Sequence, residues 1–382
     1  MKLVMTLFVR NEEDIVEANI RYHLAQGVDE VIVTDNGSVD GTVAILERLA
    51  RTEPIHLRHE ASEEMPQARC VTEMARTAAT ELRADWVINN DADEFWWPRA
   101  GNLRDVLEMV PEEYGKFRVY RVNFLPRREE GGFFADRLTV RDAISYSGSK
   151  GPMLSESERP LSQKVAHRGH PEVEISHGNH RAEGEGLVEL EGWYPITIFH
   201  FQLRTWAKFE EKILHSGAIK ESLRKRHSRS YKLLGWHREG RLTDYYDART
   251  VERMGLEAGL ADGSLVEDRR LQEYLEALGD GGDAARSGAV AEQADHRYSP
   301  ELADVRAEMV RSIRTANQTD KRVRKAEERE ARALDRLAAV ENSLWWRAGR
   351  LVPRVRSGFA GLRRPRALRS SRRGAKSRAP SS

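Results

Sequence analysis

The chain has 382 residues, of which 40% are hydrophobic and 32% charged, and its formal net charge at pH 7 is +1. This composition is that of a globular protein, and the length predicts about two to three folded units. The single cysteine, Cys70, excludes an internal disulfide, and no stretch approaches the roughly 18 to 20 consecutive apolar residues that span a bilayer. The apolar run at the N-terminus is too short for a signal peptide and leads directly into acidic residues. We therefore expect a cytoplasmic protein, either soluble or peripheral on the cytoplasmic face of the membrane.

The N-terminal part of the sequence alternates between strand and helix patterns. Residues 3–9 are nearly all apolar, as in a strand buried on both faces of a parallel sheet. Residues 15–24 then show amphipathic helical spacing that ends at Gly27. The pattern predicts an α/β fold in which helices cover both faces of a mostly parallel sheet, with right-handed crossovers. The alternation continues with strands at residues 31–34, 55–58 and 86–89 and helices at 43–49 and 68–82.

The alternation becomes irregular after Asp93. Residues 127–191 are rich in loop formers, which suggests a second region built onto the sheet. Around this region the sequence predicts a helix at 102–109, strands at 117–124, 164–167 and 196–201, and a helix at 205–220.

The C-terminal part of the chain is low in complexity and unevenly charged. Residues 279–300 are expected to be a linker, and residues 301–345 a weak heptad helix that could self-associate as a coiled coil. Residues 346–382 contain Arg and Lys but no Asp or Glu. Together with Trp345, this basic tail is either a helix on an anionic membrane surface or a disordered cationic end. No nucleic-acid recognition motif accompanies the charge, so no nucleic-acid partner is expected.

Three carboxylates follow the strand predicted at residues 86–89. Asp91, Asp93 and Glu94 stand at its carboxyl end, where open α/β sheets bind ligands. Packed together they repel one another, and a hard divalent cation with oxygen ligands, Mn²⁺ or Mg²⁺, would compensate them. Such an ion can bridge the phosphates of a nucleotide diphosphate and stabilise the charge on the leaving group. The alternative is a solvated acidic turn, which is the commoner meaning of a bare Asp-x-Asp.

A second polar cluster, DNGSVDGT, begins at Asp35 after the strand predicted at residues 31–34. The carboxylate of Asp35 could accept hydrogen bonds from a base or ribose, and the two glycines allow close backbone approach. As an isolated motif, the cluster fits equally well a tight turn in which Asp40 caps the next helix.

Taken in order, three segments resemble the nucleotide-binding half of family 2-like glycosyltransferases with the GT-A fold. They are LFVRNEEDIVEANIRYHLAQGVDEVIV, DNGSVDGT and DADEF. The RNE segment stands in place of a more usual proline-and-tyrosine loop, which looks like a bacterial branch of the family. The resemblance implies a GT-A-like, Rossmann-like sheet with a C-terminal helical extension. It makes residues 1–125 the nucleotide-sugar-binding half and residues 126–278 the acceptor-side half with its following helices.

The same resemblance implies roles for individual residues. Arg10 and Asn11 would flank the base of the nucleotide, and Asp35 would contact it. Asp91 would face the ribose or the metal, and Asp93 would be the principal metal ligand.

Two later segments, GNH at residues 178–180 and IFHFQLR at 198–204, also resemble that branch. His200 could complete the metal's coordination as a neutral imidazole, or it could be a packed histidine bonded to a backbone carbonyl. Arg204 and Lys212 could reach the diphosphate as counter-charges, or they could lie on the solvated face of a helix. His180 is placed at the diphosphate or the acceptor.

The predicted reaction transfers a sugar from a nucleotide-diphosphate donor to an acceptor hydroxyl, with inversion and with a divalent cation. It needs a carboxylate base, and Glu183 and Glu185 are the candidates, because no acidic pair stands where the family's base usually follows the acceptor loop. We expect a glycan or lipid-linked acceptor, in cell-envelope or surface-glycan synthesis. The alternatives are a non-catalytic sugar-nucleotide-binding scaffold with a helical partner-binding segment, and a sugar-phosphate nucleotidyltransferase, whose glycine-rich loop is missing after the first strand.

Overall fold

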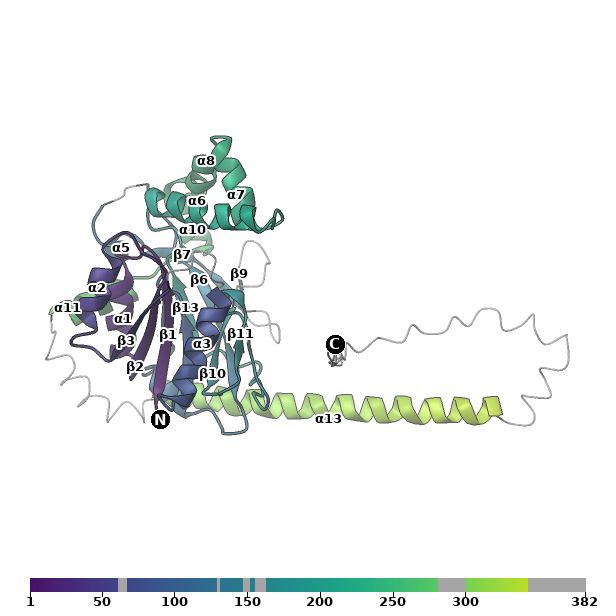
Figure 1. Cartoon of the computed structure of the whole chain (residues 1–382). Coiled ribbons are helices and arrows are strands. Elements are labelled where there is room, and N and C mark those ends of the chain that lie inside the picture. The colour runs from purple at the N-terminus through teal and green to yellow at the C-terminus, as the bar shows by residue number, and fades with distance from the viewer. Residues whose placement is uncertain (61–66, 129–130, 147–151, 155–162, 281–299, 343–382) are drawn as a thin grey trace, which may run out of the picture. The chain divides into compact units, whose positions relative to one another are not determined.

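The computed structural model describes residues 1–60, 67–128, 131–146, 152–154, 163–280 and 300–342. The chain divides into two compact units, Met1–Ala316 and Asn317–Ser382. The first unit contains the sheet and the helices packed on it (Figure 1). Nearly all of the predicted linker at 279–300 and the whole basic tail at 346–382 lie outside the described residues, as does Trp345.

An eight-stranded sheet forms the centre of the first unit. Its strands are β1 (Leu3–Val9), β2 (Glu30–Asp35), β3 (Ile55–His59), β4 (Trp86–Asn90), β5 (Glu94–Pro98), β6 (Lys116–Asn123), β10 (Gln163–Arg168) and β13 (Ile196–His200). They lie in the order β3-β2-β1-β4-β10-β6-β13-β5. Four of the seven neighbouring pairs are parallel, and the pairs β4–β10, β10–β6 and β13–β5 are antiparallel. The predicted α/β class with a mostly parallel sheet is confirmed; β5 and β10 run against the other strands.

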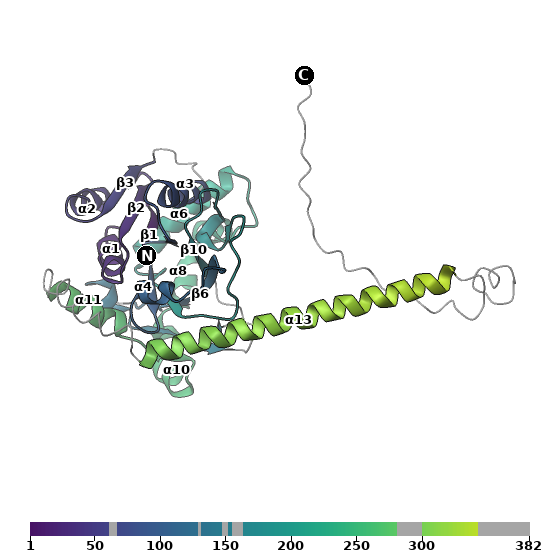
Figure 2. The same ribbon diagram turned by 90° about the horizontal axis from the view of Figure 1, so that it is seen from below.

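The first strand is apolar along its length because it is buried on both faces. Leu3, Met5 and Leu7 of β1 pack on one face with α1 (Val16–Ala25), α2 (Thr42–Leu49) and α4 (Leu103–Glu108). Val4 lies on the other face, in a core with α3 (Gln67–Thr80). Figure 2 shows α3 on one side of the strands β1 to β3 and α1 with α2 on the other. Alternate residues of one strand therefore serve two separate cores.

Three helices gather beyond the carboxyl end of β13: α6 (Trp206–Ser222), α7 (Arg229–Arg238) and α8 (Leu242–Asp247) (Figure 1). They share a small core that includes Phe209, Ile213 and Tyr246. The hydroxyl of Thr205 caps α6 by accepting a hydrogen bond of 3.2 Å from the amide of Lys208. Because α6 begins shortly after β13 ends, its side chains are delivered to the carboxyl edge of the sheet.

Shorter elements surround the sheet. Two-stranded pairings join β7 with β14, β8 with β9 and β11 with β12, and Tyr274 of α11 packs against Tyr22 and Trp97. The bounds are α5 (Phe134–Arg137), β7 (Val140–Asp142), β8 (Ile144–Tyr146), β9 (Pro152–Leu154), β11 (Glu174–Ile175), the 3-10 helix η2 (His177–Asn179), β12 (Ala182–Glu183), α9 (Val251–Met254), α10 (Leu256–Asp262), β14 (Leu265–Glu267) and α11 (Arg270–Asp280).

The predicted heptad region forms one helix, α13 (Pro300–Asn342). Its beginning packs on the first unit, where the indole nitrogen of Trp193 donates to the carbonyl of Val305 at 3.2 Å. Leu302 and Met309, two positions of the predicted heptad, are buried there. These two side chains are therefore covered within the same chain, while self-association through the rest of the helix stays a prediction. In the part of the chain that the structure describes, no helix has the length and apolar character needed to cross a membrane.

Candidate functional site

The acidic segment forms a short turn between β4 and β5, at the carboxyl edge of the sheet. β4 ends at Asn90 and β5 begins at Glu94, so that Asp91 and Asp93 lie between the two strands. The amide of Glu94 donates to the carbonyl of Asp91 at 3.0 Å, and the amide of Phe201 donates to that of Asp93 at 2.8 Å. The backbone of the turn is thus held both internally and by the chain that leaves β13.

Asp93, His200 and Lys212 meet at this edge. Oδ2 of Asp93 lies 3.0 Å from Nζ of Lys212 and 3.7 Å from Nε2 of His200. Asp93 and His200 are buried, whereas 55% of the Lys212 side chain is exposed. Burial would raise the pKa of Asp93, but the ammonium group of Lys212 holds that pKa well below its ordinary value. Asp93 in turn raises the pKa of Lys212. The carboxylate is therefore ionised, and its ammonium partner can move.

The imidazole of His200 is oriented by Asn123, which ends β6. Nδ1 of His200 lies 2.7 Å from Oδ1 of Asn123, which places the ring proton on Nδ1 and leaves the lone pair of Nε2 facing Asp93. Burial lowers the pKa of His200, and the charge of Arg121 lowers it further. A neutral ring with its second nitrogen anchored is the form in which histidine binds a metal ion.

Lys164 is fully buried between the other two carboxylates of the turn. Its Nζ lies 2.5 Å from Oδ2 of Asp91 and 3.1 Å from Oε2 of Glu94. Arg121 donates to Oε1 of Glu94 at 2.8 Å. Burial would lower the pKa of Lys164, but Asp91 and Glu94 raise it above its ordinary value. The three carboxylates of the turn are therefore matched by three cations, because Lys212 pairs with Asp93.

This pairing decides which residues fit a divalent cation. Asp93, Glu94 and His200 each offer one ligand atom, and these atoms lie within 4.8 Å of one another. Glu94 is already engaged by Arg121 and Lys164 inside the sheet. Asp93 and His200 are therefore the protein ligands that fit a hard divalent cation best, since only the exposed Lys212 has to leave.

Asp91 stands apart from that group of ligand atoms. Besides the ion pair with Lys164, its Oδ1 accepts hydrogen bonds from Gln67 at 3.0 Å and from Asn179 at 3.2 Å. Its side chain is 26% exposed. Asp91 thus presents a fixed carboxylate at the surface of the site, beside the predicted metal position.

Asp35 lies at the end of β2, buried beneath the loop that follows it. Its Oδ2 accepts hydrogen bonds from the amides of Gly37 at 3.1 Å and Ser38 at 3.2 Å. Its Oδ1 is buried and has no hydrogen-bond partner among the described residues. Gly37 has a φ of +67°, which glycine adopts readily and which lets the loop fold back over the carboxylate.

Arg10 and Asn11 hold the same loop from the end of β1. Nη1 of Arg10 donates to the carbonyl of Asn36 at 2.7 Å. Asn11, with a φ of +53°, donates its amide to Ser38 Oγ at 2.9 Å and accepts from the amide of Val39 at 2.8 Å. The structure brings Arg10, Asn11 and Asp35 together around the loop at residues 36–39.

Arg204 has a different environment from the one expected of a diphosphate-binding residue. Its guanidinium is buried and pairs with Glu12 and, at 2.6 Å, with Asp14. Burial would lower the pKa of Arg204, but these two carboxylates raise it. Burial also raises the pKa of Glu12. Arg204 therefore ties the chain after β13 to the loop after β1.

The GNH segment reaches the site through its asparagine. Asn179, with a φ of +59°, donates to Asp91, whereas His180 lies against the carbonyl of Gln163 with its Nδ1 at 2.6 Å. Glu183 and Glu185 are exposed, and the ion pair of Glu183 is with Arg181 at 3.9 Å. The candidate bases thus belong to the edge of the β11–β12 hairpin, apart from the group formed by Asp93 and His200.

Residues 7–127 match the family model described as Glycosyl transferase family 2. These residues are a family 2 glycosyltransferase domain. The domain extends from β1 past the end of β6, and it contains Asp35, Asp91 and Asp93. No curated protein sequence matches the chain.

Several solved structures are similar to the chain that carries this glycosyltransferase domain. S. aureus TarS 1–349 in complex with UDP is 14% identical, over 84% of this chain and 92% of that chain, with a TM-score of 0.32. S. aureus TarS is 14% identical, over 60% of this chain and 40% of that chain, with a TM-score of 0.30. Glucosyl-3-phosphoglycerate synthase from Mycobacterium tuberculosis, in complex with Mn²⁺, UDP and glucosyl-3-phosphoglycerate, is 19% identical, over 31% and 44%, with a TM-score of 0.24. The chain spans less than half the length of the full TarS structure and of the glucosyl-3-phosphoglycerate synthase.

Sequence reasoning missed the residues that neutralise the glycosyltransferase domain's acidic turn. Lys164 and Arg121 come from β10 and β6, and Asn123 orients His200. A signal for Lys164 was present, because a lysine beside Val165 and Ala166 in an apolar strand must find an anion when it is buried. The identity of that anion could not be predicted, because Asp91 is distant from Lys164 in the sequence.

Proposed function

We propose that the chain transfers a sugar from a nucleotide-diphosphate donor to an acceptor hydroxyl, with inversion and with the help of Mn²⁺ or Mg²⁺. The observation that carries the proposal is the meeting of Asp93, neutral His200 and the exposed Lys212 at the carboxyl edge of the sheet. All three lie at the edge where open α/β sheets bind ligands, next to the loop that covers Asp35. Residues 1–125 are the proposed donor-binding half and residues 126–278 the acceptor-side half.

The nucleoside is proposed to bind at the loop held by Arg10 and Asn11. The buried, unpartnered Oδ1 of Asp35 supports this role, since a buried carboxylate oxygen without a donor is costly unless a ligand supplies one. A base N–H would be a suitable donor. Asp91, exposed beside the same edge, is placed to accept from a ribose hydroxyl or to approach the metal.

Asp93 and His200 are the proposed protein ligands of the divalent cation, with Asp91 nearby. When bound, such a cation supplies a positive charge that neutralises the diphosphate leaving group. Asn123 keeps Nε2 of His200 directed at the proposed cation position. Glu94 is not a proposed ligand, because it is paired with Lys164 and Arg121. Asp93 and His200 would thus hold the cation as a small, oriented pair of side chains at the edge of the sheet.

Lys212 is proposed to change partners during the reaction. Its ammonium pairs with Asp93, and its largely exposed side chain can turn toward the departing diphosphate as a point charge. Arg204 is proposed to act on the same step through the backbone, since its ion pairs with Glu12 and Asp14 hold the first loop. His180 remains a proposed contact to the diphosphate or acceptor.

Glu183 and Glu185 are the proposed bases, and their exposure would leave them accessible to an acceptor hydroxyl. A glycan or lipid-linked acceptor in cell-envelope synthesis is proposed, with the basic tail at 346–382 resting on an anionic membrane surface and α13 offering weak self-association. A cytoplasmic location follows from the same proposal.

The function is tested by product analysis of the full chain with a panel of UDP-, GDP- and dTDP-sugars, with and without Mn²⁺. A glycosyltransferase releases the nucleoside diphosphate, slowly to water even when no acceptor is present. A nucleotidyltransferase would instead release pyrophosphate from a nucleoside triphosphate and a sugar phosphate. Binding without release of nucleoside diphosphate from any donor, even with mixed cell-envelope glycans as acceptors, would favour the non-catalytic scaffold and contradict the proposal.

A further inference from the structure

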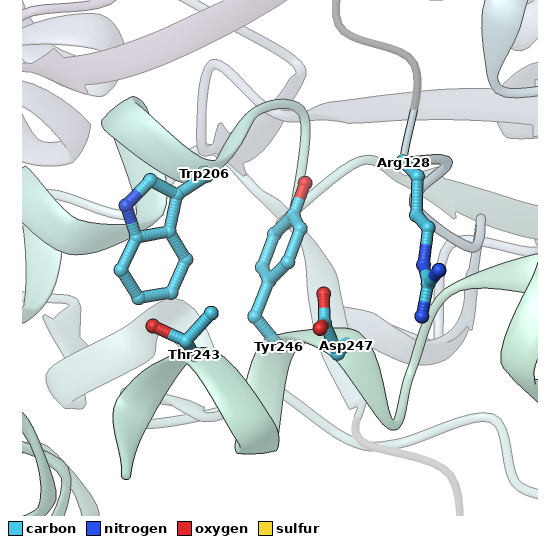
Figure 3. A pocket seen from close by; sticks show the side chains of 5 residues that line it. All are labelled: Arg128, Trp206, Thr243, Tyr246 and Asp247. Atoms are coloured by element: carbon cyan, nitrogen blue, oxygen red, sulfur yellow. The ribbon is translucent and has the colours of Figure 1, made fainter. Parts of the chain in front are cut away.

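A separate cavity of about 330 Å³ lies where α6 and α8 face the chain that leaves β6. Trp206, Tyr246, Thr243, Asp247 and Arg128 line it. Figure 3 shows the Trp206 and Tyr246 rings side by side, with Asp247 next to Tyr246 and Arg128 beyond Asp247. None of these residues belongs to the candidate donor site.

Two of the residues that line this cavity follow the strands that carry His200 and Asn123. Trp206 follows closely after His200 at the end of β13, and Arg128 follows closely after Asn123 at the end of β6. β6 and β13 are parallel neighbours, and their register pairs His200 with Asn123. The cavity therefore opens from the same edge of the sheet as the site of Asp93, on the acceptor side of the chain.

The aromatic part of the cavity is rigid. The rings of Trp206 and Tyr246 meet edge to face, with centroids 5.5 Å apart and an angle of 81° between their planes. Both rings also pack against Phe209 in the small core of α6 to α8. A fixed indole next to a phenol ring presents an apolar surface, which suits a ligand that is itself apolar on one face.

Three polar side chains line the rest of the cavity. Among the described residues, the side chains of Arg128, Thr243 and Asp247 have no hydrogen-bond or ion-pair partner, although the backbone at Arg128 and Asp247 is held by Glu252 and Thr250. A guanidinium, a hydroxyl and a carboxylate thus line one cavity, with Thr243 on the Trp206 side of the Tyr246 ring and Asp247 and Arg128 on the other (Figure 3). Adjacent hydroxyl groups can bind such a set, donating to Asp247 and accepting from Arg128.

The geometry points to a binding site for a single sugar ring of the acceptor, with one face on the Trp206 indole and its hydroxyls on Asp247, Thr243 and Arg128. This inference rests on the proposed function, because it supplies the substrate class for the acceptor side. The volume supports one ring, since about 330 Å³ is near the lower limit for small-ligand sites and is small for a nucleotide sugar.

The test is saturation-transfer NMR of the full chain with the methyl glycosides of glucose, galactose, mannose, N-acetylglucosamine and rhamnose. We expect at least one glycoside to receive saturation, and Trp206→Leu and Asp247→Asn each to weaken its binding about tenfold. Trp236→Leu is the matched control, because Trp236 lies in the same helical group but does not line the cavity; it should leave the signal unchanged. Asp247→Asn keeps the shape of the site, so the test does not depend on whether Trp206→Leu folds.

UDP titration in the presence of Mn²⁺, on the same samples, separates this inference from the proposed function. Retained UDP binding without any glycoside signal, or with signals that survive Asp247→Asn, overturns the sugar site alone. Glycoside binding that depends on Trp206 and Asp247, in a protein that binds no nucleotide diphosphate, supports a sugar site and overturns the transferase.

Discussion

Nζ of Lys212 lies 3.0 Å from Oδ2 of Asp93, so the carboxylate proposed as the principal metal ligand is already paired with a lysine from α6. The pairing holds the pKa of Asp93 well below its ordinary value and raises that of Lys212. A divalent cation and the ammonium group must therefore compete for one oxygen. The proposed site differs in this respect from an acidic cluster that has only a metal ion to neutralise it.

Lys212→Met is expected to tighten Mn²⁺ binding about three- to tenfold, because it removes a competing charge from Asp93. The same change should weaken UDP binding if the ammonium turns to the diphosphate. Calorimetric titration of Mn²⁺ and then of UDP measures both effects. Lys232→Met is the control, since Lys232 is an exposed lysine of α7 outside the candidate site. Unchanged or weaker Mn²⁺ binding by Lys212→Met would exclude the competition.

Lys164→Met is expected to lower the free energy of unfolding by about 3 kcal/mol or more, because it leaves Asp91 and Glu94 without their shared buried cation. Lys212→Met also leaves a buried carboxylate without its cation, but it should cost less than Lys164→Met, because 55% of the Lys212 side chain is exposed and water can reach that side of the pair. Urea denaturation of both variants gives the comparison. Equal losses in the free energy of unfolding would show that the burial of Lys164 does not make its ion pairs more important for stability.

Mn²⁺ affinity should depend on pH through His200. Burial keeps the pKa of this histidine below 6.5, so the ring stays neutral at pH 7 and the affinity should be flat from pH 8 to about 6.5. Below that range protonation removes the Nε2 lone pair and the affinity should fall. His200→Asn should bind Mn²⁺ more weakly and lose this fall at low pH, apart from the part contributed by Asp93. An identical pH profile in the variant would rule out His200 as a ligand.

Two other buried histidines predict a loss of stability in acid. Burial lowers the pKa of His23 and His167 to about 4, below their unfolded value of 6.5. The unfolded chain therefore binds protons first, and stability that is complete above pH 6.5 declines as the pH falls toward 4. Each ring should cost about 2 kcal/mol at pH 5. His167→Gln should reduce the slope of unfolding free energy against pH between 6.5 and 5, and an unchanged slope would contradict a buried neutral ring.

The elements with strong local patterns were predictable from the sequence. The strand at 3–9 and the helix at 68–82 correspond to β1 and α3, because continuous apolar runs and helical spacing are local signals. β5 was not predicted. It follows the acidic turn directly, and only its antiparallel pairing with β13, about a hundred residues later in the chain, makes it a strand.

Within the candidate site, the positions of acids at strand ends were predictable, but their partners were not. The periodicity of β4 places Asp91 and Asp93 at the sheet edge. The pairing of Lys164 with Asp91 depends on strand order, and the pairing of Lys212 with Asp93 depends on where α6 packs. The partners of Arg204 were not predictable either. Its sequence context suggested a ligand contact, and the fold places it in a buried pair with Glu12 and Asp14.

The central claim is that Asp93 binds the divalent cation that holds the diphosphate. Calorimetric titration of UDP into wild-type protein and Asp93→Asn, each with and without Mn²⁺, tests it most directly, with Asp304→Asn as an exposed control on α13. Wild type and the control should bind UDP more tightly when Mn²⁺ is present, and Asp93→Asn should lose that gain while its unfolding transition stays cooperative. The same gain in the Asp93→Asn variant as in wild type would contradict the account.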